Sequence, residues 1–181
     1  MVYLPQGILI DIVRRVGNHG FRELAPFIAS ANEGSIYRPF LMKCFEAGNI
    51  TARYVEGLRR AVKLGPSNEN LQLMRAGEEY IPYAGFAFGV FAICGGHYEE
   101  GMEALTLLAE RAGWLEEMVD IGERVMAQIA DIEPPMSGNY DATFTFPHGD
   151  VPNCVHFACT MDDVCFDCIA YWYSRRVRQL C

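Results

Sequence analysis

Apolar residues recur at helical spacing from the start of this chain to residue 133. Between residues 50 and 64, for example, Tyr54, Leu58 and Val62 fall on one face of a helix. Glycine or proline separates most of the successive periodic segments, as expected where helices begin and end. The pattern predicts helices over residues 8–16, 21–31, 39–47, 50–64, 68–76, 83–94, 98–112 and 115–132. Gly48-Asn49 is expected to form a turn and a helix cap.

The segment 80–96 contains no charged residue and no histidine. A membrane-spanning helix needs about 20 apolar residues. This run is shorter, and it is interrupted by Pro82 and four glycines. We therefore expect a helix buried between other helices and no membrane partner.

One internal repeat is visible in the helical region. Residues 52–58 and 84–90 share the pattern Ala-x-aromatic-x-x-Gly-aliphatic. Their offset matches the period of roughly 30–40 residues that is typical of solenoids built from helix pairs. The repeat predicts that Gly57 and Gly89 occupy equivalent positions, each where another helix comes close. The expected fold class is all-α, with helix pairs stacked into an α-solenoid.

The chain from residue 134 onward follows a different pattern. Glycine, proline, asparagine and aspartate predict a loop from Met136 to Pro152, which phenylalanines could pin to the helices: Phe144, Phe146 and Phe157. A final amphipathic helix is expected over residues 168–180, with its aromatic side chains on the body and its arginines in water. The chain then divides into residues 1–36, 37–133 and 134–181.

Composition and charge exclude several classes of protein. Hydrophobic residues make up 51% of the chain, which is typical of a globular protein and not of a disordered one. The formal net charge of −8 argues against a nucleic-acid partner, because phosphate binding requires a basic surface. The charge is uneven, with +4 over residues 1–63 and −8 over residues 96–133.

The N-terminus shows no basic and apolar pattern of a secretory signal. We therefore expect a cytoplasmic or nuclear protein in which the seven cysteines stay reduced.

Four of these cysteines are concentrated in one short segment: Cys154, Cys159, Cys165 and Cys168. Cys165 and Cys168 form a Cys-x-x-Cys step, a common element of zinc sites, and His156 is a possible substitute ligand. The spacing predicts one structural zinc, with a redox dithiol or ordinary structural thiols as alternatives. Cys181 is expected to lie about 20 Å away at the other end of the final helix and to take no part.

The sequence contains no phosphate-binding loop, no nucleophile elbow and no zinc-protease motif. Cys94 and His97 form a conceivable nucleophile pair, but a buried cysteine before a Gly-Gly turn is the favoured interpretation. We expect no catalytic activity.

A resemblance begins with the segment Leu4-Pro5-Gln6-Gly7-Ile8-Leu9-Ile10-Asp11-Ile12-Val13-Arg14-Arg15-Val16-Gly17. It resembles the opening of an F-box, and Phe21-x-x-Leu24 resembles the next helix of that box. Phe40-Leu41-Met42-Lys43-Cys44, followed by Gly48-Asn49, Ala52, Tyr54 and Gly57, is similar to a plant family of short F-box proteins. In that family the box precedes Sel-like or tetratricopeptide-like repeats, and many members end in a Cys-rich stretch. The later half of an F-box usually has a Cys-Lys or Cys-Arg step before an aromatic residue, but residues 27–36 contain Asn32-Glu33-Gly34-Ser35 instead. The stretch between the box and the first repeat is also shortened.

The resemblance implies a substrate-recognition adaptor of a cullin-type (SCF) E3 ubiquitin ligase. F-box-like helices within residues 1–36 would bind a Skp-type linker, Sel-like or tetratricopeptide-like repeats over residues 37–133 would bind a target protein, and a Cys-rich tail would follow. The residues expected to contact the linker form one apolar patch: Leu4, Pro5, Ile8, Leu9, Ile12 and Val16. An alternative is a helical-repeat protein–protein interaction scaffold with a zinc-stapled tail and no link to ubiquitination.

Overall fold

The computed structural model describes residues 28–147, 149, 151–157, 159 and 165–181. Helices and loops make up this part of the chain, which contains no β-strand. The expectation of an all-α fold is therefore confirmed. The helices are α3 (Arg38–Glu46), α4 (Ile50–Leu64), α5 (Asn68–Arg75), α6 (Pro82–Cys94), α7 (Tyr98–Ala112), α8 (Leu115–Asp131) and α9 (Phe166–Leu180), with a short 3-10 helix, η2 (Asn153–Phe157).

The helix boundaries lie close to those that periodicity and turn residues predict. Asn49 caps α4 through its side chain, which accepts a hydrogen bond of 2.9 Å from the Ala52 N–H. Gly48 before it has a φ of +78°, which only glycine adopts without strain. The final helix begins two residues earlier than predicted, because Cys165 serves as its N-cap. The predicted helix 8–16 and most of the predicted helix 21–31 lie outside the described residues.

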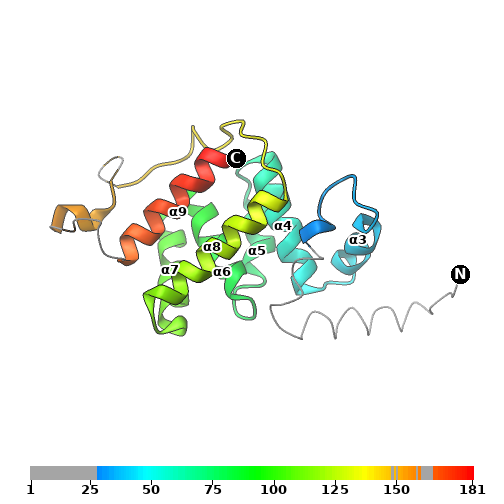
Figure 1. Ribbon diagram of the computed structural model, residues 1–181, viewed down its shortest axis with the longest axis horizontal. Helices are drawn as coiled ribbons and strands as arrows, with labels where there is room; N and C mark the ends of the chain where they lie inside the picture. Colours follow the sequence, from blue (N-terminus) through cyan, green and yellow to red (C-terminus); the bar gives the residue numbers. More distant parts are fainter. Residues whose placement is uncertain (1–27, 148, 150, 158, 160–164) are drawn as a thin grey trace, which may run out of the picture.

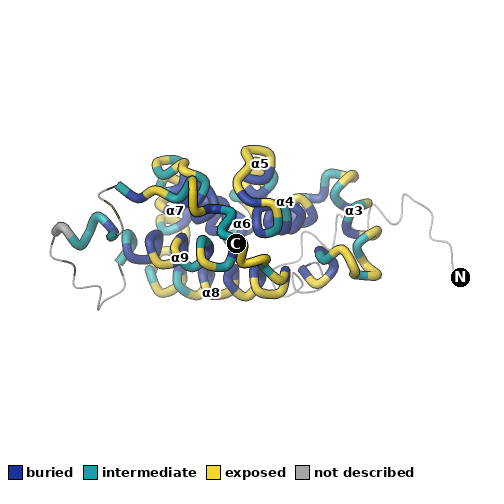
Figure 2. The backbone as a smooth tube through the Cα atoms, turned by 90° about the horizontal axis from the view of Figure 1, so that it is seen from above, coloured by how far each residue is buried: buried dark blue, intermediate teal, exposed yellow. Residues whose placement is uncertain are grey.

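Helix α6 is the centre of the molecule (Figures 1 and 2). It packs against α4, α5, α7, α8 and α9, and all of its residues from Tyr83 to Cys94 are buried. A helix that is apolar on every side needs such a cover. The uncharged segment 80–96 thus contains a buried core helix, as predicted. Among the described residues, no helix combines the length and the apolarity needed to cross a membrane.

Two close helix crossings confirm the prediction made for the repeated glycines. A Cβ atom on Gly57 would lie 2.8 Å from the Cβ atom of Leu73 in α5. A Cβ atom on Gly89 would lie 2.7 Å from Leu105 Cγ of α7 and 3.0 Å from the Gly101 carbonyl oxygen. In both α4 and α6, the glycine therefore lies where the next helix in the chain comes closest.

The loop that follows α8 is ordered by contacts with the helices. Phe146 is buried, Phe144 packs against the core, and the Tyr140 hydroxyl donates a hydrogen bond of 2.8 Å to the Ala61 carbonyl oxygen. Backbone hydrogen bonds from Met136 and Asn139 also reach the last two residues of the chain. The pinning predicted for Phe144 and Phe146 is confirmed, whereas the side chain of Phe157 lies outside the described part.

Helix α9 lies beside α8 and α6 (Figure 1). Its residues Tyr171 and Tyr173 are buried, and Tyr173 packs edge-on against Phe86 of α6. Arg176 pairs with Glu123, and Arg178 pairs with Asp141 at 2.7 Å. The helix is amphipathic, as expected, but of the three aromatic residues in the predicted segment 168–180 only the two tyrosines are buried, whereas Trp172 is 45% exposed. Both arginines pair with acids of the same chain.

Candidate metal centre

The four clustered cysteines come from two short stretches of chain. Cys154 lies in η2, and Cys159 follows it, with its N–H donating to the Cys154 carbonyl oxygen at 3.1 Å. Cys165 caps the start of α9, where its sulfur accepts a 3.4 Å hydrogen bond from the Cys168 N–H. The Cys-x-x-Cys step thus places two sulfurs at a helix start, and the turn at η2 brings the other two to the same point.

The sulfur atoms are spaced as a tetrahedral site requires. All four Sγ atoms lie within 4.8 Å of one another. Four of the separations are 3.5 Å for Cys154–Cys168, 3.4 Å for Cys154–Cys165, 3.9 Å for Cys159–Cys165 and 3.8 Å for Cys159–Cys168. Sulfurs bound to zinc at about 2.3 Å in a tetrahedron are roughly 3.8 Å apart. The four cysteines are therefore compatible with one structural metal ion.

The same distances describe four thiols and no disulfide. A disulfide requires a sulfur–sulfur bond of about 2.05 Å, far shorter than the 3.4 Å seen here. An all-thiolate donor set is soft, and a tetrahedral arrangement of four thiolates is typical of zinc or an iron–sulfur centre. Magnesium and calcium prefer oxygen ligands, so the donor set does not suit them.

The environment makes the four thiols unequal. Burial and the hydrogen bond with Cys165 raise the pKa of Cys154 to about 11. Burial also raises the pKa of Cys168. At Cys165 burial opposes ionisation, but the Cys168 N–H and the neighbouring thiols lower the pKa by stabilising its thiolate. Since only thiolates bind zinc, occupancy of the site is expected to release protons.

The centre is attached to the helical body through η2 and α9. The Asn153 side-chain amide donates a 3.2 Å hydrogen bond to the hydroxyl of Tyr98 on α7. The rings of Tyr98 and Tyr171 both pack edge-on against Phe146, at centroid distances of 5.2 and 5.3 Å. The cysteine cluster therefore adjoins an aromatic cluster that joins α7, α9 and the preceding loop.

Several residues singled out in the sequence lie elsewhere. Cys181 is buried at the far end of α9 and takes no part in the cluster, as predicted. Cys94 is fully buried, and its thiol donates to the Ser174 carbonyl oxygen at 3.2 Å, whereas His97 is exposed. Burial raises the pKa of Cys94, which suits a packing residue rather than a nucleophile.

Two sets of expected site residues remain untested. The backbone of His156 belongs to η2, but its side chain lies outside the described part of the chain. The apolar residues expected to contact a Skp-type linker also lie outside it: Leu4, Pro5, Ile8, Leu9, Ile12 and Val16.

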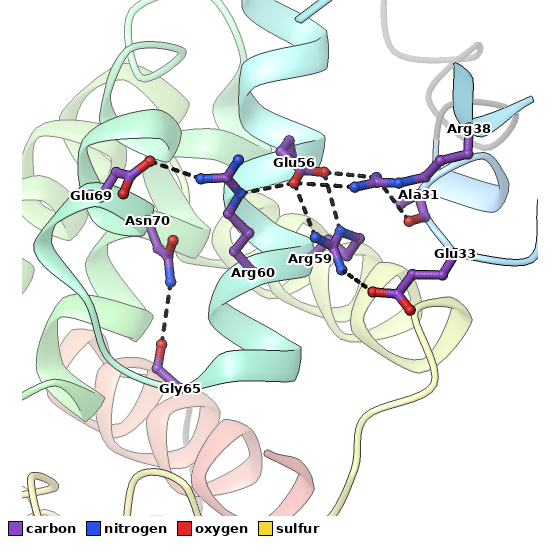
Figure 3. A network of polar contacts seen from close by, with 9 residues as sticks. All are labelled: Ala31, Glu33, Arg38, Glu56, Arg59, Arg60, Gly65, Glu69 and Asn70. Atoms are coloured by element: carbon purple, nitrogen blue, oxygen red, sulfur yellow. Dashed lines mark hydrogen bonds and ion pairs between the residues drawn. The ribbon is translucent and has the colours of Figure 1, made fainter. Parts of the chain in front are cut away.

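A buried charge network is the feature that sequence reasoning missed (Figure 3). The side chain of Glu56 is only 1% exposed, yet it pairs with Arg38, Arg59 and Arg60 at 2.7, 3.1 and 2.8 Å. The sequence did contain a signal for this network: Glu56 lies inside the apolar stripe of a helix, and Arg59 and Arg60 follow it one turn later.

Comparisons of this chain with family models, with curated proteins and with solved structures find no match.

Proposed function

We propose that the protein is a non-catalytic substrate-recognition adaptor of a cullin-type ubiquitin ligase. The apolar patch of the F-box-like segment binds a Skp-type linker, and the helical body binds a target protein for ubiquitination. The linker-binding residues are those the resemblance indicates: Leu4, Pro5, Ile8, Leu9, Ile12 and Val16. The adaptor works in the reducing environment of the cytoplasm or the nucleus.

The observation that supports this proposal best is the Glu56 network. It lies where the F-box-like segment ends, and it attaches residues 31–38 to α4 (Figure 3). Arg38 joins the Glu56 carboxylate and donates to the Ala31 carbonyl oxygen at 3.0 Å. Glu33 pairs with Arg59 at 3.6 Å. An adaptor must hold its target at a fixed position relative to the ligase, and a buried ion network is a rigid connection of the required kind.

Helix pairs α4–α5 and α6–α7 form two Sel-like or tetratricopeptide-like repeats in this proposal. The equivalent crossings at Gly57 and Gly89 support the assignment. Further support comes from the helix starts, since α4 begins at Ile50 and α6 at Pro82, the same offset as between the two glycines. Repeats of this kind commonly bind proteins through the surface that the stacked helices create.

Binding to a purified Skp-type linker tests the adaptor function. The wild-type chain is expected to bind the linker, and Ile8→Asp combined with Leu9→Asp should abolish binding. Leu64→Asp combined with Met136→Asp is the matched control, because both residues are apolar, 70% exposed and outside the F-box-like segment. Absence of binding by the wild-type chain, or equal loss in both double variants, would refute the adaptor function.

A second candidate function is favoured by the cysteine cluster: a protein-interaction scaffold outside any ubiquitin ligase, stapled by zinc at its tail. In both functions we propose that Cys154, Cys159, Cys165 and Cys168 hold one structural Zn²⁺. The supporting observation is that all four sulfurs lie within 4.8 Å of one another, with four of the separations between 3.4 Å and 3.9 Å. Zinc there would fix η2 against the start of α9. The scaffold is the remaining function if the linker does not bind.

Elemental analysis of the purified chain tests the zinc centre. About one zinc per chain is expected, and Cys165→Ser with Cys168→Ser should remove it. The control is Cys44→Ala with Cys94→Ala, which removes two buried thiols outside the cluster. Replacement by Co²⁺ gives an independent signature, because tetrahedral thiolate coordination produces intense visible absorption. A chain that carries neither metal after purification and reconstitution would overturn the zinc assignment.

A further inference from the structure

A small groove opens at one edge of the helical body. It lies between the residues before α6, the last turn of α7 and the first turns of α8, and has a volume of about 100 Å³. Its floor is apolar and includes Pro82, Leu108 and Ile121, and its rim carries Glu78, Glu79 and Glu117. We call it the acid-rimmed groove. Small-molecule sites usually measure about 300 Å³ or more, so this groove fits one side chain of a protein partner.

The charge of the rim selects the partner. In the described part of the chain, the carboxylates of Glu78, Glu79 and Glu117 form no ion pair. Arg111 also lines the groove, and its guanidinium donates at 3.2 Å to the backbone carbonyl of Glu78. The segment 96–133, which contributes α7 and α8, carries a net charge of −8. An acidic partner would be repelled here, whereas a basic one is attracted.

Two exposed aromatic residues flank the acid-rimmed groove in sequence. Tyr80 is 66% exposed beside Glu79, and Trp114 is 76% exposed in the turn between α7 and α8. The α5–α6 and α7–α8 connections lie at the same edge of the molecule (Figure 1). Tryptophan and tyrosine are enriched among the residues that dominate protein binding, and their faces attract guanidinium groups.

We propose that the acid-rimmed groove binds a segment of the target protein in which arginine or lysine neighbours an apolar residue. The apolar side chain enters the groove, and the basic side chains pair with Glu79 and Glu117 and stack on Trp114. This proposal rests on the proposed function, since it names the surface and the chemistry by which the adaptor takes its target.

Selection from a displayed library of random dodecapeptides tests the proposal on the full chain. Peptides retained by the wild type should be enriched in arginine or lysine beside an apolar residue. Glu79→Lys with Glu117→Lys should weaken their binding about tenfold or more. Glu46→Lys with Glu99→Lys is the matched control: it changes the charge equally, Glu46 is the last residue of α3, and Glu99 lies about 14 Å along α7 from Leu108, the first residue of that helix to line the groove. The control should change binding by less than about twofold.

The fluorescence of Trp114, in the turn between the α7 and α8 residues that line the groove, supplies a second readout. The chain has two tryptophans, so Trp172→Phe leaves Trp114 alone to report binding of a selected peptide. Its emission should shift with the same concentration dependence as binding. The proposal fails if basic residues are not enriched or if both charge variants lose binding equally. It also fails if the groove variant instead abolishes self-association, which would identify a second copy of the chain as the occupant. Binding to the Skp-type linker is measured separately, so either proposal can fail alone.

Discussion

Replacing Gly89 with alanine tests how closely α6 and α7 approach. The new methyl group would lie 2.7 Å from Leu105 Cγ and 3.0 Å from the carbonyl oxygen of Gly101. The first neighbour is a buried side chain and the second is backbone, so neither can move freely. Overpacking of this kind costs about 1–3 kcal/mol of the free energy of unfolding. The helix propensity of alanine offsets up to about 1 kcal/mol of that cost.

Gly85→Ala is the matched control on the same helix, one turn earlier. A Cβ atom there would lie 3.4 Å from Glu78 Cγ, an ordinary contact with a movable side chain. The propensity gain is then realised without a clash, so this variant should be about 0.5–1 kcal/mol more stable than the wild type. Both variants add one methyl group to α6, but the expected changes in the free energy of unfolding have opposite signs.

Thermal unfolding followed by circular dichroism measures the difference. For a chain of this size, about 1 kcal/mol shifts the midpoint by about 2–4 °C, so Gly89→Ala should unfold roughly 2–12 °C below Gly85→Ala. Gly101→Ala should destabilise at least as much, because its Cβ would meet the Gly89 carbonyl oxygen at 2.5 Å. Equal midpoints for Gly85→Ala and Gly89→Ala would refute the close crossing of α6 and α7.

Three further predictions concern two buried polar groups and the cysteine cluster. Burial raises the pKa of the Glu56 carboxyl, but the three arginines around it outweigh this effect and lower that pKa to about 2. The ionised carboxylate therefore stabilises the fold at neutral pH, and this stabilisation is lost as the pH falls from about 4.5 towards 2. Glu56→Gln should cost about 3 kcal/mol at pH 7 and flatten this acid dependence in urea titrations. Tyr140→Phe should cost about 1 kcal/mol in the same assay, since the Ala61 carbonyl loses a buried donor. A zinc chelator should lower the melting temperature of the wild type but not that of Cys165→Ser.

The helical body was predictable because its signals are local. Periodicity located the helices of the part of the chain that the structure describes, and Gly48-Asn49 marked the start of α4 to the residue. The repeated Ala-x-aromatic-x-x-Gly pattern even located two close crossings, since a glycine inside a helix is costly unless another backbone requires the space.

The loop after α8 and the Glu56 network depend on contacts between distant residues. Tyr140 meets Ala61 across 79 positions of sequence, and nothing near Tyr140 in the chain indicates that its hydroxyl is buried. Arg38 and Glu56 are likewise 18 residues apart and belong to different helices. Single-sequence patterns carry no information on such pairs, because the pairing is decided by how the helices pack.

The cysteine cluster could be predicted in part from the sequence. The spacing of Cys165 and Cys168 predicts a pair of sulfurs at a helix start, since residues three apart lie on one face of a turn. The contribution of Cys154 and Cys159 depends on the return of the preceding segment. Cys154 and Cys159 are brought to the start of α9 by η2 and by the hydrogen bond from the Asn153 side chain to the Tyr98 hydroxyl.

The position of α9 explains why a metal centre at its start would matter to the whole body. Helix α6 is apolar on every side, and α9 covers one of those sides through Tyr173 against Phe86 and the Ser174 carbonyl against the Cys94 thiol. The ends of a helix fray readily unless contacts hold them. The far end of α9 is held by backbone bonds from Met136 and Asn139. The four sulfurs lie at the start of α9. A metal ion bound there would therefore hold the second end of the helix that covers α6.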